Sequence, residues 1–222
     1  KSLDENSFSF FISPLIKIEK KEYSYTSKRK FDFVIFTSKN GILNFEESIG
    51  NDVKVIVIGD GTYNLAKEKG IKKLINIQGN SEDLKIKIKS LLEKNSKILH
   101  PTSTDLNVDF KDFFVSLGCS YNPVSCYHSK KLNSKPEIFE NFFKSCKDGV
   151  ITLFSKRTAI SLKNEISRFK LWENCVDKRV LVLSKSIANE IREIRIGGLF
   201  ISEQPNEASM LELINKTKKK EY

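Results

Sequence analysis

Continuous apolar runs of strand length recur along this chain, and each run stops at a small turn that carries a hydroxyl or a glycine. One pair of runs spans 31–36 and 53–58, and a second pair spans 150–154 and 180–183. Strands that are buried on both faces have this continuous apolar pattern, and the amphipathic stretch after each run predicts a helix. The pattern therefore predicts parallel β-α-β units that occur twice.

Turn and cap signals mark the ends of several expected helices. Gly70 and Gly118 close two of them, because glycine readily takes the left-handed conformation found just past a helix C-terminus. Asn80 precedes a first turn that carries two acids, which is a typical N-cap signal. The expected helices span 40–48, 62–70, 80–94, 108–117, 136–146, 158–169, 187–194 and 207–218, and further short strands span 71–77, 97–99 and 199–202.

Two extended segments, 14–18 and 123–128, flank the first pair of strands. Each begins at a proline and lacks the regular alternation of a half-buried strand. Such segments on either side of one compact unit predict a two-stranded linker that enters and leaves it. The chain of 222 residues is also long enough for two domains, each of about 100 residues.

The net charge of +10 comes from 38 Lys and Arg against 28 Asp and Glu, and many of the lysines are scattered over expected helix faces. Scattered lysine indicates solvated surface, with a basic cleft for an anionic partner as the alternative. The sequence carries no nucleic-acid-binding motif, so we expect no nucleic-acid partner. Its apolar runs are far shorter than the roughly 20 residues that span a bilayer, and it opens without a signal-peptide pattern. We therefore expect a cytoplasmic protein with no membrane partner.

The cysteines and histidines do not predict a metal site. The four cysteines are Cys119, Cys126, Cys146 and Cys175. They have no CxxC spacing, and the two histidines, His100 and His128, do not cluster with them. Structural zinc needs clustered ligands, so we expect no metal and reduced, mostly buried thiols.

Six short motifs occur in a fixed order along the whole chain. They are the linker segment 14–16, the strand end at 36–38, the glycine turn 59–62, the extended segment with Tyr127, the strand end at 154–155, and the helix-opening segment 205–211. Each motif alone is weak, but the ordered set resembles the uroporphyrinogen-III synthase family.

The resemblance implies an α/β fold of two flavodoxin-like parallel-sheet domains joined by a two-stranded linker, with the active-site cleft between them. The inserted domain would span 20–122, and the discontinuous domain would combine 1–18 with 130–222. The linkers would lie at about 13–20 and 121–131. The strand that usually opens the discontinuous domain has no counterpart at the start of this sequence.

The resemblance also implies an enzyme that needs no cofactor. The family closes hydroxymethylbilane, a linear tetrapyrrole, to uroporphyrinogen III with inversion of ring D and loss of water, a step of haem biosynthesis. This substrate carries eight carboxylates, so its binding calls for hydroxyls, lysines and the backbone N–H groups of helix N-termini. Loss of the terminal hydroxyl leaves a cationic azafulvene, and a proton donor at that oxygen would speed the step. We expect a monomer that acts on this small molecule.

Site residues follow from the same resemblance. Tyr127 matches a tyrosine that the family places at the cleft and is the candidate acid that assists hydroxyl loss, with a packing role in the linker as the alternative. Thr62 matches a threonine at a helix N-terminus, and there an N-cap is the alternative. The residues assigned to substrate binding are Thr37, Ser38, Lys39, Asn40, Gly61, Thr62, Ser155, Lys156 and Ser186.

Two features depart from the family pattern, and one other class of function stays open. Segment 184–187 replaces a Gly-x-x-Thr-like turn and leaves Ser186 as the hydroxyl offered there, and loop 100–105 lacks the arginines often seen in it. The alternative function is a non-catalytic two-lobed module that binds a small anion. A nucleotide-binding enzyme fits less well, because 59–61 lacks the third glycine of a GxGxxG turn and the lysine of a P-loop.

Overall fold

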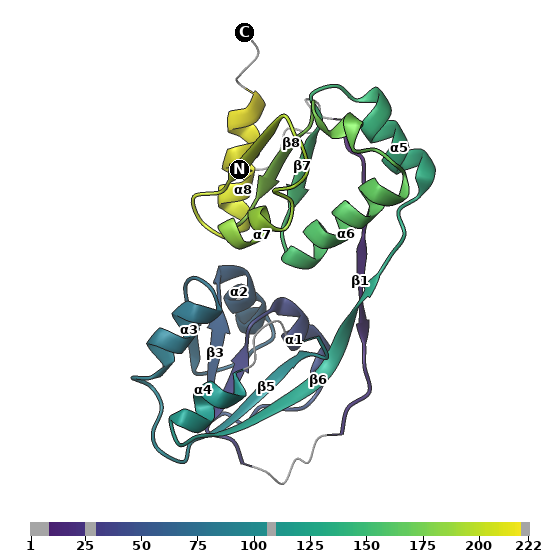
Figure 1. Ribbon diagram of the computed structural model, residues 1–222. Coiled ribbons are helices and arrows are strands. Elements are labelled where there is room, and N and C mark those ends of the chain that lie inside the picture. Colours follow the sequence, from purple (N-terminus) through teal and green to yellow (C-terminus); the bar gives the residue numbers. More distant parts are fainter. Residues whose placement is uncertain (1–8, 25–29, 106–109, 219–222) are drawn as a thin grey trace. The chain divides into compact units, whose positions relative to one another are not determined.

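The computed structural model describes residues 9–24, 30–105 and 110–218, which form a mixed α/β protein with parallel sheets (Figure 1). The parallel α/β class expected from the sequence is confirmed. The chain divides into two compact units, one made of residues 18–130 and the other of residues 1–17 and 131–222. We call them the inserted unit and the discontinuous unit.

The structure has these elements. The strands are β1 (Ile16–Lys20), β2 (Phe33–Phe36), β3 (Lys54–Ile58), β4 (Leu74–Ile77), β5 (Lys97–Ser103), β6 (Ser120–Lys131), β7 (Val150–Leu153), β8 (Arg179–Val182) and β9 (Gly198–Ile201). The helices are α1 (Lys39–Asn44), α2 (Asp60–Glu68), α3 (Ser81–Ile88), α4 (Lys111–Ser116), α5 (Pro136–Ser145), α6 (Lys156–Arg168), the 3-10 turn η2 (Glu173–Cys175), α7 (Lys185–Asn189) and α8 (Glu207–Lys218).

The sheet of the inserted unit has the strand order β1-β6-β5-β2-β3-β4, and the pairs from β6 to β4 are parallel. Numbered along the chain from β2, this order is 3-2-1-4-5, whereas the flavodoxin order is 2-1-3-4-5. The chain builds outward from β2 to β4 and then crosses to β5 on the other side of β2. The switch point where parallel sheets collect ligand groups therefore lies between the carboxyl ends of β2 and β5.

Both faces of this sheet are covered, which explains why its strands are continuous apolar runs. In β2, Phe33 and Ile35 belong to the core beneath α3 and α4, whereas Val34 and Phe36 belong to the core beneath α1 and α2. This alternation is the two-residue period of a strand with helices on both sides. The result is a three-layer α/β/α unit (Figure 1).

The discontinuous unit contains a parallel sheet with the order β7-β8-β9. Its larger core joins Leu153 and Val180 to side chains of α5, α6 and α7, and its smaller core joins Leu181 to Met210 of α8. In the part of the chain that the structure describes, β7 pairs along one edge only, with β8.

The segment expected as a short strand at 97–99 followed by a loop is a single long strand. β5 continues through Pro101 to Ser103 and pairs with β6 as far as its end. β2 pairs with β5 only as far as Leu99, so the proline lies beyond the last of these pairs. Proline is usually excluded from central strands, and β5 tolerates Pro101 at a position where β2 no longer pairs with it.

Several helices end earlier than their apolar patterns predict. α3 ends at Ile88, whose carbonyl accepts a hydrogen bond from the Leu91 N–H in a turn (2.9 Å), and Leu91 still packs against the same core. α1 ends at Asn44, because Phe45 takes an extended conformation and is buried. α7 and α4 also end before their expected ends, and the expected start of α4 at 108 lies outside the described residues. Apolar spacing does not distinguish a helix from a turn that returns side chains to the same core.

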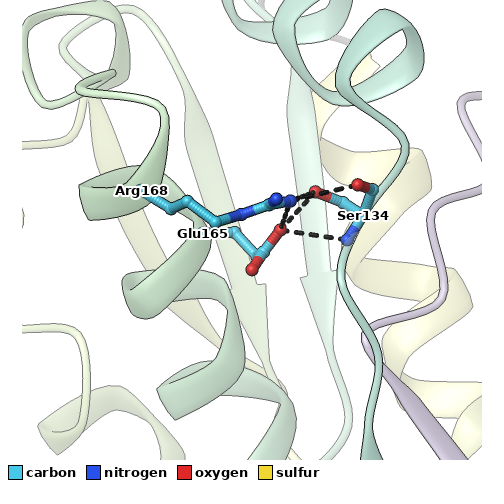
Figure 2. A network of polar contacts seen from close by, with 3 residues as sticks. All are labelled: Ser134, Glu165 and Arg168. Carbon is cyan, nitrogen blue, oxygen red and sulfur yellow. Dashed lines mark hydrogen bonds and ion pairs between the residues drawn. The ribbon is translucent and has the colours of Figure 1, made fainter.

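A buried carboxylate on α6 holds the segment that connects β6 to α5. Glu165 is fully buried, and its Oε2 accepts hydrogen bonds from the Ser134 N–H (3.0 Å), the Ser134 hydroxyl (2.5 Å) and Arg168 Nη2 (2.5 Å) (Figure 2). Arg168 also donates to the Ser134 carbonyl (3.1 Å). Burial alone would raise the pKa of Glu165, but the hydrogen bonds from Ser134 and Arg168 outweigh it and hold this pKa below its ordinary value.

Candidate functional site

The carboxyl ends of β2, β3 and β5 bring several predicted site residues into one region of the inserted unit. Thr37 and Ser38 follow β2 directly, and the turn that begins at Gly59 follows the neighbouring β3. Thr37, Ser38 and Asn40 are partly exposed, and Lys39 is exposed. Strand order alone therefore places the hydroxyls of the first motif beside the glycine turn of the second.

The Thr37 hydroxyl contacts a buried histidine that the sequence analysis did not assign to the site. Thr37 Oγ1 lies 3.2 Å from His100 Nε2, and His100 Nδ1 lies 2.7 Å from the Tyr121 hydroxyl. His100 is 1% exposed, and this burial lowers its pKa to about 4. The imidazole is therefore neutral at physiological pH. The only signal in the sequence was a histidine that continues an apolar run.

Ser38 and Asn40 have mainly local roles in α1. The Ser38 hydroxyl accepts a hydrogen bond from the Asn40 N–H (3.2 Å) and is the N-cap of the helix. The Asn40 carbonyl accepts from the Asn44 side chain (2.9 Å). These contacts are the capping role that competed with ligand binding for each hydroxyl of the motif.

Lys39 extends over the first turn of α2. A Cβ atom placed on Gly61 would lie 2.7 Å from Lys39 Cε and 3.2 Å from Lys39 Nζ. A side chain at Gly61 would displace the flexible end of Lys39 from this position. A cation at the positive end of a helix is unfavourable unless an anion lies between them, so this pair is suited to a shared anionic ligand.

Thr62 is not the N-cap of α2, and that alternative was wrong. Gly59 is the N-cap, with φ of 77°, and Thr62 is the third residue of the helix. Thr62 is 6% exposed, and its hydroxyl makes no hydrogen bond within the residues that the structure describes. Without a capping duty, this hydroxyl stays a predicted ligand group at the start of α2.

The sequence analysis also missed an acid at the same helix start. Asp60 is the first residue of α2, where a carboxylate interacts favourably with the helix dipole. Its Oδ1 accepts hydrogen bonds from Asn76 Nδ2 (2.8 Å) and from Gln78. These bonds join α2 to the end of β4, so the Asp60 carboxylate lies on the side of α2 that faces that strand.

Tyr127, the candidate acid, lies in the core of the inserted unit. It is 7% exposed and packs with the apolar residues beneath α1 and α2. Its carbonyl accepts a hydrogen bond from the Thr104 N–H (3.0 Å), which joins β6 to the end of β5. This environment favours the packing role, and the catalytic role stays a prediction.

The predicted residues of the discontinuous unit occupy the carboxyl ends of β7 and β8. Ser155 caps α6, with its hydroxyl accepting from the Thr158 N–H (3.1 Å). At α7 the cap is Ser184, which accepts from a backbone N–H and lies 2.9 Å from the Ser186 hydroxyl. The sequence analysis named only Ser186 there. Lys156 is exposed, and its Nζ lies 4.0 Å from Glu190 Oε1.

A separate cavity of about 710 Å³ in the inserted unit lies at the opposite edge of the sheet, where β2, β3 and β5 begin. Its charged lining is mixed. The lysines are Lys30, Lys54 and Lys94, and the acids are Asp32, Asp52 and Glu93. Ligands of parallel α/β sheets bind beyond the carboxyl ends of the strands, so we place the candidate site at Thr37, Lys39 and Thr62.

No group of His, Cys, Asp and Glu able to hold a metal ion occurs among the described residues. Cys126 and Cys175 are buried, which raises the pKa of each thiol to about 11 and leaves both protonated at neutral pH. No helix in the described ranges is long and apolar enough to span a membrane.

The inserted unit is a doubly wound parallel sheet in which hydroxyls, a lysine and the start of α2 follow the carboxyl ends of β2 and β3, an arrangement typical of α/β proteins that bind anionic ligands. The family model described as "Uroporphyrinogen-III synthase HemD" matches residues 1–212. Since the match covers nearly the whole chain, the chain belongs to the uroporphyrinogen-III synthase family. The resemblance noted in the sequence is thereby confirmed, and with it the assignment as a cyclising lyase of haem biosynthesis.

Two solved structures share this fold at low sequence identity. Uroporphyrinogen-III synthetase from Helicobacter pylori is 17% identical with a TM-score of 0.62, over 91% of each chain. A mutant uroporphyrinogen III synthase from the extremely thermophilic bacterium Thermus thermophilus is 14% identical with a TM-score of 0.54, over 94% of this chain and 88% of that one. No curated protein sequence matches the chain.

Proposed function

We propose that this chain closes hydroxymethylbilane to uroporphyrinogen III, with inversion of ring D and loss of water, using substrate contacts at the carboxyl ends of its parallel strands. The family match over residues 1–212 carries the proposal. The reaction requires no oxidation or reduction, because closure of the macrocycle releases one molecule of water. The protein's part is to bind the carboxylates and hold the chain in a geometry that favours inversion over direct closure.

The inserted unit offers three kinds of donor for a substrate carboxylate. Thr37 and Thr62 supply hydroxyls, Lys39 supplies an ammonium group, and the first turn of α2 supplies backbone N–H groups. Charge-assisted hydrogen bonds to carboxylates are roughly twice as strong as neutral ones. We assign these residues to one carboxylate-binding region. Ser38 and Asn40 shape it through the cap of α1.

The discontinuous unit offers fewer uncommitted donors. Ser155 and Ser184 cap their own helices, and the groups that remain for substrate, Ser186 and the exposed Lys156, already contact Ser184 and Glu190. Gly61 has no equivalent in 184–187, where the glycine turn is missing. We propose that this unit supplies the weaker share of the carboxylate contacts.

Tyr127 is retained as the candidate acid for loss of the terminal hydroxyl. Its phenol hydroxyl is a hydrogen-bond donor. Its burial argues that such a step would need the phenol to reach substrate from within the core. The proposal further includes a monomer that acts in the cytoplasm without a cofactor.

The deciding experiment supplies the purified chain with hydroxymethylbilane, oxidises the products and separates the isomers. Isomer III formed faster than the spontaneous reaction supports the proposal, whereas isomer I alone, at the spontaneous rate, would remove it. Size-exclusion chromatography at the assay concentration tests the monomer.

Two variants then test the roles within the site. Thr62→Ala is expected to raise KM about tenfold, because a hydrogen bond to a charged group contributes about 1.5 kcal/mol. Tyr127→Phe is expected to lower kcat if the phenol donates a proton and to leave it unchanged if Tyr127 only packs. Thr158→Ser, which keeps its hydroxyl beside Ser155, is the matched control.

A further inference from the structure

We propose that His100 is a positioning residue, which fixes the Thr37 hydroxyl as a hydrogen-bond donor toward substrate through the chain Tyr121–His100–Thr37. The inference rests on the proposed function, because it assigns a carboxylate of that substrate as the acceptor. It adds two buried residues to the site, neither of which is expected to touch substrate.

The three side chains come from three different strands or strand ends of the inserted unit. Tyr121 lies on β6, His100 on the neighbouring β5, and Thr37 at the end of β2, on the other side of β5. The distances are 2.7 Å from the Tyr121 hydroxyl to Nδ1 and 3.2 Å from Nε2 to Thr37 Oγ1. This series of hydrogen bonds thus crosses the sheet from β6 to the end of β2 and reaches the switch point.

The imidazole ring is held in place by its neighbours. Its centroid lies 5.6 Å from that of Phe110 in an edge-to-face contact, and the Tyr121 ring stacks on Phe114 at 5.2 Å. Aromatic packing of this kind restricts the ring orientation. Both ring nitrogens are therefore kept in line with their hydroxyl partners.

A neutral imidazole has one nitrogen that donates and one that accepts. His100 is neutral because burial lowers its pKa to about 4. The phenol is a stronger acid than a neutral imidazole N–H, so the short contact at Nδ1 is best made with the Tyr121 hydroxyl as donor. The proton of the ring is then on Nε2, which donates to Thr37 Oγ1.

This polarity decides what Thr37 can offer. Its oxygen already accepts from Nε2, so its own hydrogen points to a different partner. No other hydrogen bond of the Thr37 side chain occurs among the described residues. The hydroxyl hydrogen is thus available to a carboxylate, and a rotation that would turn the oxygen's lone pair toward substrate is disfavoured. Hydrogen bonds that run in one direction also strengthen each other.

The first test reads the tautomer directly and does not depend on activity. The chain has two histidines, so ¹⁵N-detected NMR of the side chains gives two sets of signals, which His128→Gln assigns. We expect His100 to carry its proton on Nε2 throughout pH 6–8, and to become a mixture of tautomers in Tyr121→Phe. A proton on Nδ1 in the wild-type chain would overturn the proposal.

The second test is a double-mutant cycle with hydroxymethylbilane as substrate. Tyr121→Phe keeps the ring that packs on Phe114 and is expected to raise KM about fivefold at unchanged kcat, the size of one neutral hydrogen bond. In the Thr37→Val background, Tyr121→Phe is expected to have no further effect on KM. In the Thr37→Ser background, which keeps the hydroxyl, the effect of Tyr121→Phe on KM is expected to return. An equal rise in KM in both backgrounds would show a role independent of Thr37 and overturn the proposal.

The two proposals fail in different ways. If the wild-type chain forms no uroporphyrinogen III, the proposed function is lost, and the tautomer measurement still decides the direction of the hydrogen bonds. If the chain is active and Tyr121→Phe changes neither tautomer nor KM, the function stands and the positioning role of His100 is lost. Equal thermal unfolding of wild type and Tyr121→Phe is the control for intact folding.

Discussion

Burial gives His100 a second, measurable consequence at the scale of one residue. Its pKa in the folded chain is about 4, below the ordinary value of 6.5. A lowered pKa means that the unfolded chain binds the proton first as the pH falls. The contribution of the neutral imidazole to stability is therefore fully present above pH 6.5 and is lost as the pH approaches 4.

The prediction is that, between these pH values, the free energy of unfolding of the wild-type chain falls by about 3 kcal/mol more than that of His100→Asn. Asparagine keeps two polar atoms for the hydroxyl partners but does not titrate. Urea unfolding at a series of pH values measures the difference. Parallel curves for the two proteins would contradict the buried, neutral state of His100.

Single residues also show how much of the site the sequence could predict. Thr37 and the glycine turn at 59–62 were assigned to the site from the family resemblance, and the structure puts both after the carboxyl ends of neighbouring parallel strands. The binding role of Thr62 stays a prediction, whereas its alternative role as N-cap was wrong, because the helix begins at Asp60 with Gly59 as its N-cap. His100 was missed, because its role depends on Tyr121, which is distant in sequence and near only across the sheet.

At the scale of an element, the buried cluster on α6 is expected to be a main anchor of the discontinuous unit (Figure 2). Glu165→Gln removes the charge that Arg168 and Ser134 share and is predicted to cost about 2 kcal/mol of unfolding free energy, because charge-assisted hydrogen bonds to a buried carboxylate are replaced by bonds to a neutral amide. Glu140→Gln is the matched control, because it removes a surface pair with Lys144 on α5 that contributes about 0.5 kcal/mol. Urea unfolding at pH 7 compares them, and equal losses would contradict the anchoring role.

The same cluster has a pH signature in the acid range. The pKa of Glu165 is held below its ordinary value, so its contribution is present above the unfolded-state pKa and is lost as the pH falls through the lower, folded-state pKa. In Glu165→Gln, the free energy of unfolding is therefore expected to depend less on pH below the ordinary glutamate pKa of 4.5. This range lies below most of the window in which His100 acts.

The packing of α1 on β5 gives a prediction for a glycine. A Cβ atom at Gly41 would lie 2.8 Å from the Pro101 carbonyl oxygen and 3.0 Å from Phe36 Cδ1. Alanine normally stabilises a helix, but the clash is expected to destabilise the chain by about 1–3 kcal/mol. At Gly50 the nearest atom, Val53 Cγ2, would be at 3.6 Å. Thermal unfolding should separate Gly41→Ala from a near-neutral Gly50→Ala, and a stabilised Gly41→Ala would disprove the close approach.

Elements were predicted best where their signals are local. α5 and α8 follow the expected ranges closely, because a proline at the first position and a polar start mark where they begin. β5 was predicted too short and α3 too long, since Pro101 resembles a strand end and Leu91 continues an apolar spacing. In both cases the deciding contact is tertiary, and no local signal reports it.

At the scale of the whole molecule, the two units differ in how the chain forms them. The inserted unit is continuous, from 18 to 130, whereas the discontinuous unit needs both 1–17 and 131–222. The inserted unit has a core on each face of its sheet, and every residue of both cores lies within it. Its size of about 100 residues is also that of a typical independent domain.

We therefore predict that the fragment 18–130 folds by itself and unfolds in a single cooperative urea transition, with native-like far-UV circular dichroism. The fragment 131–222 is expected not to do so, because Leu15 belongs to the same core as Phe139 and Phe143 of α5. It also loses the bond from the Leu132 N–H to the Leu15 carbonyl (2.9 Å). A non-cooperative transition for 18–130 would show that its two cores are insufficient, and a cooperative one for 131–222 would show that the Leu15 contact is dispensable. The tautomer signals of His100 should survive in the isolated 18–130 fragment, because every residue that holds that imidazole lies inside it.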